Sequence, residues 1–336
     1  MPRGSSVHRA PPLTRRRTTV HPSARPASST RRGAVPVVIP THDTRRENRR
    51  ARRGRHKGTH EHDNFQSGFD ALGRLAIDGV VVSARAVDLA TGRTLFAVDD
   101  SVSMPTAGVG TVLLLIEVAA RLANDPQENL RLVDRTAIDA VADAGLWQHL
   151  QIPSMPVADL AAFVGATNDN LATNVLLRRV GLDAVRERAE SLGLSRTALL
   201  DVVRDERGPD DAPQLSIGSA RELTWLLATL ANGEVVDAAV SSRVIGWLSL
   251  NSDLSMVASA FGLDPQSHRK PDHGVLLVNT TGTDAGVRAE VGVLRGPRAG
   301  VSYAVVTQFD DTNLHYRLAV LEGMRTLGTD LLEYVH

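Results

Sequence analysis

Short apolar runs gather in two distant parts of the chain and predict β-strands there. In the first part they cover residues 79–87 and 94–98, and in the second they cover residues 274–278, 289–294 and 303–308. Each run has the length of a strand and is bounded by turn-forming residues. The predicted strands therefore flank a long middle region.

The middle region has the apolar spacing of amphipathic helices. Within residues 219–230, the leucines from Leu223 to Leu230 fall on one face behind Ser219, which can cap the first turn. We expect another helix at residues 313–335. Strands at both ends with helices between them predict one mixed α/β domain over residues 65–336. Its helical lobe would cover roughly residues 125–265, with a cleft between the lobes.

Charge divides the chain into two unequal parts, although the formal net charge of the whole is zero. Residues 1–57 hold fifteen arginines and one lysine against Asp43 and Glu47, a net charge of +14, so the remainder carries −14. This segment has few bulky apolar residues and cannot bury enough surface to fold alone. We therefore expect residues 1–64 to form a disordered arginine-rich tail.

Three interpretations of this tail remain open. It has no specific role and includes residues before the true start of translation, or it folds back on the acidic domain. Alternatively, it binds nucleic acid or an acidic partner through residues 1–57, because clustered arginines attract phosphates. The histidines His56, His60 and His62 lie in a segment too flexible to close a metal site, so we expect no metal there.

The N-terminal region lacks the features of a secretory signal. Its apolar stretch at residues 34–40 is short and contains two prolines, and the arginines at residues 15–17 precede no apolar core. No stretch approaches the roughly twenty apolar residues that span a bilayer. We therefore expect a cytoplasmic protein without a membrane segment. The absence of cysteine also excludes disulfides and thiol catalysis.

Three short motifs follow one another along the domain. They read Gly108-Val109-Gly110-Thr111, Asn168-Asp169-Asn170 and Thr280-Thr281-Gly282-Thr283. The first follows Pro105 and enters an apolar helix-like stretch, the second precedes another helix-like stretch, and the third lies in a predicted strand. In order, spacing and surroundings they resemble the S-x-x-K, S-D-N and K-T-G motifs of the class A serine β-lactamase and penicillin-binding-protein superfamily.

The resemblance extends beyond the motifs. Residues 88–96 resemble the early hairpin of the family, and the final helix lies where the family closes its sheet. The likeness covers residues 65–336. It implies a β-lactamase-like α/β fold, in which an antiparallel sheet is flanked by helices and an all-helical lobe is inserted.

Each reactive position of the family is replaced in this chain. Gly108 stands at the nucleophilic serine, Thr111 and Thr280 stand at the two lysines, and Asn168 stands at the serine of the second motif. Glycine offers no attacking oxygen, and a threonine hydroxyl carries no charge at neutral pH. The chain has only two lysines, Lys57 and Lys270, and we interpret Lys270 as part of a solvated turn.

The resemblance also implies which groups of a ligand site remain. The backbone N–H groups of Gly108 and Thr283 would form the oxyanion hole, which does not depend on side chains. The positions of Asn170, Thr281, Gly282, Thr283 and Arg288 would contact the ligand. The cleft would therefore hold a small carboxylate or a lactam-like molecule, and no cofactor is implied.

Four other residues near these motifs have simpler interpretations. The family's deacylating glutamate has no clear counterpart in residues 203–211, where we interpret Asp205 and Glu206 as surface charges on a loop. Trp147 is expected to be a packing residue, and His149 an ordinary histidine without a carboxylate partner.

Two classes of function follow for the domain. The first is a cytoplasmic pseudoenzyme that binds a ligand or regulates another process. The alternative is a weak or atypical hydrolase of an ester, lactam or amide that uses the hydroxyl of Thr106, Thr111 or Thr281. A second alternative assigns the main role to the tail, through nucleic acid or an acidic partner.

Overall fold

The computed structural model describes residues 65–142 and 144–336. The predicted tail at residues 1–64 and its histidines His56, His60 and His62 lie outside the described residues. The described part contains a five-stranded antiparallel sheet with the strand order β2-β1-β10-β9-β8. Its strands are β1 (Val81–Asp88), β2 (Thr94–Val98), β8 (Leu276–Asp284), β9 (Val287–Arg295) and β10 (Gly300–Gln308).

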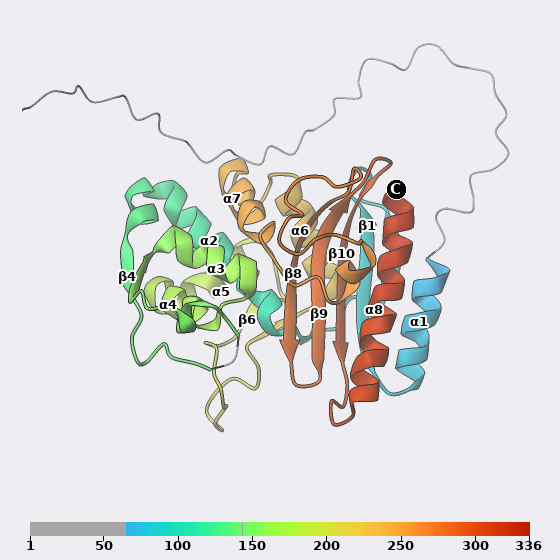
Figure 1. The fold of residues 1–336 in the computed structure, drawn as a ribbon, viewed down its shortest axis with the longest axis horizontal. Coiled ribbons are helices and arrows are strands. Elements are labelled where there is room, and N and C mark those ends of the chain that lie inside the picture. Colours follow the sequence, from blue (N-terminus) through green and yellow to red (C-terminus); the bar gives the residue numbers. More distant parts are fainter. Residues whose placement is uncertain (1–64, 143) are drawn as a thin grey trace, which may run out of the picture. The chain divides into compact units, whose positions relative to one another are not determined.

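Helices cover both faces of this sheet. The N-terminal helix α1 (Gln66–Ile77) and the C-terminal helix α8 (Leu314–Val335) lie side by side on one face (Figure 1). The opposite face carries α6 (Ala220–Ala231) and the helical lobe. Successive side chains of β10 point to opposite faces of the sheet. Tyr303 therefore packs in the core beneath α8, and Ala304 packs in the core on the side of the helical lobe.

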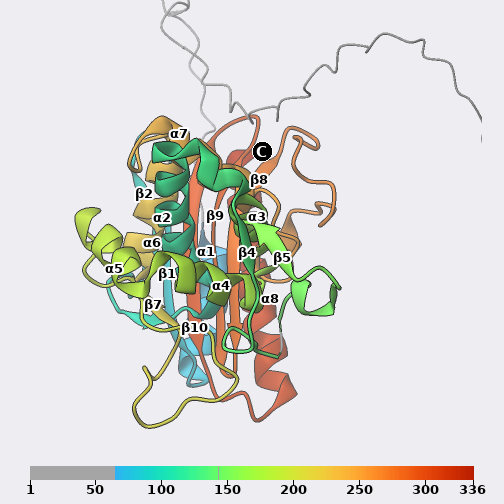
Figure 2. The same cartoon turned by 90° about the vertical axis from the view of Figure 1, so that its left-hand side faces the viewer.

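The helical lobe is built around one apolar helix, α2 (Thr111–Asn124). Around it lie α3 (Val157–Thr167), α4 (Asn170–Val180), α5 (Leu182–Ser191) and α7 (Ala238–Leu248), as Figure 2 shows from the lobe side. The lobe therefore begins with α2, before the predicted boundary near residue 125. The boundary was misplaced because α2 follows the first motif without a composition break.

Residues 107–124 are long and apolar enough to cross a bilayer by composition alone, but 78% of them are buried inside the domain. A helix surrounded by other helices needs apolar residues on every side. The composition of α2 is thus explained by its place at the centre of the lobe.

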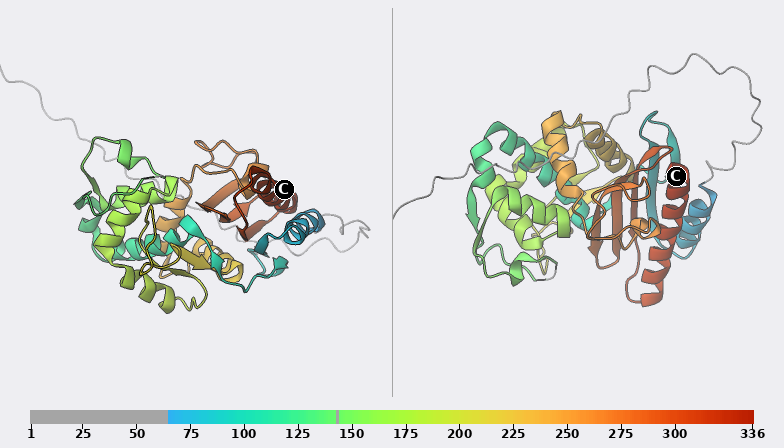
Figure 3. Two further views of the ribbon diagram at one scale, coloured as in Figure 1. Left: turned by 90° about the horizontal axis from the view of Figure 1, so that it is seen from below. Right: turned by 45° about the horizontal axis from the view of Figure 1, so that its top comes forward.

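Short elements complete the described chain. They are β3 (Met104–Pro105), β4 (Leu132–Asp134), β5 (Ser154–Pro156), β6 (Ala198–Leu199), β7 (Ser216–Gly218) and the 3₁₀ turns η1 (Ala107–Gly110), η2 (Pro126–Leu130), η3 (Trp147–His149) and η4 (Val257–Ala260). The strand β8 forms one border of the large sheet and contacts η1. Seen from below in Figure 3, the lobe and the sheet meet at this border.

The predicted fold class is confirmed, and so are all five strands of the sheet. Local capping was also predicted correctly, since the Ser219 side chain accepts a hydrogen bond from the Glu222 amide at the start of α6. Asn313 caps α8 in the same way by accepting from the His315 amide.

Candidate functional site

A cavity of about 590 Å³ lies where the border strand β8 meets the helical lobe. Its wall is formed by Gly108 of η1, by Asn168 and Asn170 at the corner between α3 and α4, and by Thr281 and Thr283 of β8. Residues of the loops at positions 203–207 and 252–253 complete it. The three motifs of the sequence therefore converge on one cavity.

The corner between α3 and α4 is held by Asp169. Its buried carboxylate caps α4 by accepting from the Ala172 amide at 2.9 Å, and it accepts from the amides of Leu146 and Trp147 at 2.6 and 2.8 Å. Three backbone N–H groups thus share one carboxylate. The side chain fixes the loop that carries Trp147 against the corner and supplies no reacting group.

The side chain of Asn168 closes the floor of the cavity. Asn168 ends α3 in the left-handed conformation, with φ of 48°, and its Nδ2 donates to the Thr281 carbonyl at 3.1 Å. Its Oδ1 is buried and has no hydrogen-bond partner among the described residues. A Cβ placed on Gly108 would lie 3.1 Å from this Oδ1. Any side chain at position 108 would therefore be crowded by Asn168.

Two backbone N–H groups remain available beside Asn168. The Gly108 amide donates to no group among residues 65–142 and 144–336. On β8, the Thr281 carbonyl points away from β9 to meet Asn168, so the Thr283 amide, two residues along, emerges from the same border. The border and η1 are in close contact, because a Cβ on Gly282 would lie 2.1 Å from the Thr106 carbonyl oxygen.

None of the candidate threonines is placed beside a base. The Thr111 hydroxyl donates to the Gly108 carbonyl at 2.8 Å, in the turn η1 that leads into its helix. The Thr106 hydroxyl pairs with the hydroxyl of Ser216 at 2.7 Å and is fully buried. The Thr281 hydroxyl faces only the Asn168 amide, at 3.4 Å. A threonine nucleophile would need a neighbouring proton acceptor, and these contacts provide none.

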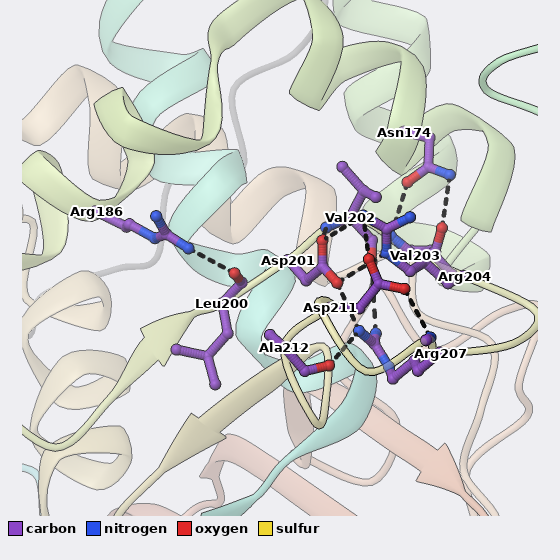
Figure 4. A network of polar contacts seen from close by, with 11 residues as sticks. Asn174, Arg186, Leu200, Asp201, Val202, Val203, Arg204, Arg207, Asp211 and Ala212 are labelled. Carbon is purple, nitrogen blue, oxygen red and sulfur yellow. Dashed lines mark hydrogen bonds and ion pairs between the residues drawn. The ribbon is translucent and has the colours of Figure 1, made fainter.

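Salt bridges hold the loop at residues 201–211, which forms part of the cavity wall. Figure 4 shows Asp201 and Asp211 directed toward Arg204 and Arg207. Burial alone would raise the pKa of Asp201, but hydrogen bonds from Arg204, the Val202 amide and Arg207 outweigh it and lower that pKa. Both arginines that line the cavity are thus already paired within the protein.

The same loop is tied to α4 and to the segment before Trp147. Asn174 makes a two-way contact with Val203, donating to its carbonyl at 3.0 Å and accepting from its amide at 2.8 Å. Asp205 lines the cavity and accepts from the Ala142 amide at 2.9 Å. Asp205 is thus an exposed loop residue, as expected, and it also holds a neighbouring loop at the cavity.

The position of Arg288 differs from the expectation. Arg288 lies on β9, opposite Thr283 of β8. Its guanidinium donates hydrogen bonds to the carbonyls of Asp284 and Val287 and lies over the ring of Phe309. It does not line the cavity. These contacts hold the guanidinium away from the cavity wall, so a role in holding a ligand carboxylate is not supported.

The other single-residue interpretations can be compared with their places in the fold. Trp147 is fully buried and donates to the Ile152 carbonyl at 3.0 Å, which confirms a packing role. His149 and Lys270 are exposed and do not line the cavity. Gly282 and Thr280 lie beside the cavity but are not part of its wall. In the described part of the chain, no three His, Asp or Glu side chains gather to hold a metal ion.

A buried glutamate beneath the border strand was missed by the sequence analysis. Glu290 of β9 accepts from the Tyr303 hydroxyl at 2.6 Å, from Asn279 at 3.0 Å and from the Ala258 amide at 3.2 Å. Burial nevertheless raises the pKa of Glu290 to about 7. The only signal in the sequence was a charged residue inside an apolar strand.

Comparisons with known proteins agree with this geometry. The profile of the beta-lactamase enzyme family matches residues 70–335. A search of curated proteins gave no match.

Solved structures match over most of the chain. A β-lactamase from Sphaerobacter thermophilus is 20% identical, with a TM-score of 0.67, and the match covers 81% of this chain and 98% of that one. A class A β-lactamase from Mycobacterium abscessus is 19% identical, with a TM-score of 0.63 and coverage of 77% and 97%. The penicillin-binding protein PBP-A is 14% identical, with a TM-score of 0.64 and coverage of 80% and 94%. At these identities the likeness shows the fold alone.

Proposed function

Because the chain belongs to the beta-lactamase enzyme family, we propose that it is a non-catalytic member that binds a ligand or regulates another process. One observation carries this proposal. By the sequence resemblance Gly108 stands where the family has its nucleophile, and a Cβ at this position would lie in a tight contact, 3.1 Å from Asn168 Oδ1. The cavity therefore lacks a hydroxyl at the position from which the family's nucleophile acts, and the hydroxyl of Thr281 in its wall faces only the Asn168 amide among the described residues.

The donors that remain support reversible binding. The N–H groups of Gly108 and Thr283 can hold a carbonyl or carboxylate oxygen, because backbone donors need no particular side chain. Asn170 and Thr281 line the same cavity and can hydrogen-bond the rest of a small molecule. A lactam-like molecule or a small carboxylate is the ligand that we propose, without a cofactor.

A labelled penicillin tests the absence of covalent chemistry. We expect no added mass on the full chain after incubation, as read by intact-protein mass spectrometry, while an active class A β-lactamase treated in parallel forms an acyl adduct. The same samples can be assayed for turnover of lactams and esters. A covalent adduct or sustained turnover would show that a threonine acts as nucleophile and would overturn the proposal.

Restoring the reactive groups tests whether the scaffold is preserved. The variant Gly108→Ser, Thr111→Lys, Thr280→Lys should recover slow acylation, and adding Asn168→Ser should increase it because the new serine is then no longer crowded. Asn168→Ser alone is the matched control and should stay unreactive. If the fourfold variant folds and remains inert, the cavity differs from a working site in more than these positions.

For residues 1–57 we propose binding to nucleic acid or to an acidic partner, on the strength of their net charge of +14. Deleting residues 1–60 should abolish salt-sensitive retention on DNA, and retention by the truncated chain would contradict this role. We also propose that the protein acts in the cytoplasm, which cell fractionation tests directly.

A further inference from the structure

A second cavity, of about 890 Å³, lies at the C-terminal end of α8. Its apolar wall is formed by Phe261 and Leu263 after η4, by Val275 before β8 and by Leu332 of α8. It shares no lining residue with the cavity at Gly108. An apolar side chain that enters this second cavity therefore leaves water for an apolar surface, which favours binding.

The polar part of the wall carries unpaired acidic groups. The carboxylates of Asp272 and Glu333 line the cavity, and neither forms a salt bridge with an arginine or lysine of the described residues. Arg298 also lines it, but its guanidinium donates to the carbonyls of the last turn of α8, where the helix dipole is negative. The histidines His273 and His336 complete the wall. The rim therefore favours an apolar segment that is flanked by positive charge.

The N-terminal tail contains a sequence of this kind. The stretch Pro36-Val37-Val38-Ile39-Pro40 is the one place in residues 1–64 where three valine, leucine or isoleucine residues follow one another. Seven arginines follow it at residues 45–55. Each proline fixes its own φ and biases the residue before it toward extended backbone, so an extended bound form costs this stretch less conformational entropy.

The described chain begins near the same end of α8. The ring centroid of Phe65, the first described residue, lies 5.9 Å from that of Tyr334, and α1 and α8 lie side by side (Figure 1). Residues 41–64, 24 in number, separate the apolar stretch from Phe65. A chain of that length spans roughly 27 Å even when it is as compact as a Gly/Ser linker. This exceeds the roughly 10–12 Å diameter of the helix that it has to pass.

We propose that residues 36–40 bind in this second cavity of the same chain. Val37, Val38 and Ile39 pack against the apolar wall, and the arginines at residues 45–55 lie near the acidic rim. Because the segment is tethered, its binding is intramolecular and needs little intrinsic affinity. The inference gives a definite place to the interpretation in which the tail folds back on the acidic domain. It is independent of any ligand beside Gly108.

Hydrogen exchange on full-length proteins tests whether the segment covers the cavity. One variant replaces its aliphatic residues, Val37→Asn, Val38→Asn, Ile39→Asn. A matched control variant replaces three aliphatic residues nearer the N-terminus, Val7→Asn, Leu13→Asn, Val20→Asn. The amides of residues 261–263 and 272–275 should exchange at least about threefold faster in the first variant than in the wild-type chain, and at the wild-type rate in the control. Equal exchange in all three proteins would overturn the inference.

A disulfide test uses the absence of cysteine from the chain. In the double variant Val38→Cys, Leu332→Cys, mild oxidation should form a disulfide within one chain at least about tenfold faster than in the control Val38→Cys, Ile77→Cys. Ile77 is 85% exposed and belongs to the helix that directly follows the tail, so without docking its thiol would react at least as fast. Leu263→Cys serves as a second partner if Leu332→Cys does not fold.

Mass spectrometry and non-reducing gels distinguish the products of this oxidation. Equal rates for the cavity and control positions would overturn the inference. A disulfide that forms only between two chains would also overturn it, because the cavity would then bind a second copy.

A synthetic peptide of residues 33–42 tests the same cavity from solution. In calorimetry it should bind the full-length variant with three asparagines at residues 37–39 at least about tenfold more tightly than the wild-type chain, whose own segment already fills the site. Adding Leu332→Asp to that variant should abolish the binding. Equal binding to the two proteins, or binding to neither, would contradict docking of the segment.

Discussion

The floor of the cavity and the segments that support it differ in how completely their polar groups are paired. In the supports, Asp169 receives three backbone hydrogen bonds, and Asp201 and Asp211 are paired with the two nearby arginines (Figure 4). In the floor, the Gly108 amide and Asn168 Oδ1 have no partner among the described residues. The groups that support the cavity are thus paired within the protein, while these two groups of its floor are not.

Two adjacent residues of one motif show the same contrast. Asp169 is fully buried and saturated with donors, whereas Asn168, one residue earlier, uses only half of its amide. A protein that needed only a stable fold would gain by filling or satisfying the floor. The unpaired Asn168 Oδ1 is therefore a cost to stability that no described residue offsets.

Among substitutions in the floor and its supports, Asp169→Ala is expected to lower the free energy of unfolding the most. Three buried N–H groups would lose their acceptor, so the free energy of unfolding should fall by about 4 kcal/mol. Asn168→Ala is the matched control and should lower it by only about 1 to 2 kcal/mol, because it loses one hydrogen bond and puts alanine in the left-handed conformation. Urea unfolding measures both. Equal effects would mean that the floor stabilises the fold as much as its support does.

The next largest effect is expected from Glu290, as a dependence of the free energy of unfolding on pH. Its pKa is raised to about 7 in the folded protein from 4.5, so the folded state binds more protons than the unfolded state between these values. Its contribution to stability is therefore full below about pH 4.5 and is lost as the pH rises to about 7. The 2.5-unit difference corresponds to about 3 kcal/mol.

Glu290→Gln should remove this part of the pH dependence. In denaturant unfolding at a series of pH values from 4.5 to 8, the free energy of unfolding should fall less with rising pH in the variant than in the wild-type chain. Asp201, whose pKa is lowered, acts with the opposite sign and only in more acidic solution. Parallel curves for the two proteins would exclude Glu290 as the source.

The smallest effect is expected from Gly108→Ala. The new methyl group would meet Asn168 Oδ1 and the Thr281 carbonyl oxygen at 3.1 Å, which should destabilise the fold by about 1 kcal/mol. In the Asn168→Ala background about half of this cost should disappear, because the contact with the Thr281 carbonyl oxygen remains. A double-mutant cycle measures the coupling, and strictly additive effects would show that the two side chains do not compete for space.

Sequence patterns were sufficient for the features that depend on local chemistry. Strand alternation, the Ser219 cap and the order of the three motifs each follow from neighbouring residues. The contact between Asn168 and Thr281 joins residues 113 positions apart and requires a left-handed backbone at Asn168, so no local pattern announces it. The place of Arg288 depends on strand register, where one residue changes which part of the border a side chain reaches.

The close contact at Gly282 also has a consequence for self-association. Outer strands of sheets usually offer a template on which other chains polymerise. On β8 that template is interrupted, because Asn168 occupies the Thr281 carbonyl and the backbone of Thr106 abuts Gly282. We expect the opposite rim, formed by β2, to be where concentrated solutions begin to aggregate, and a charged substitution there to improve solubility.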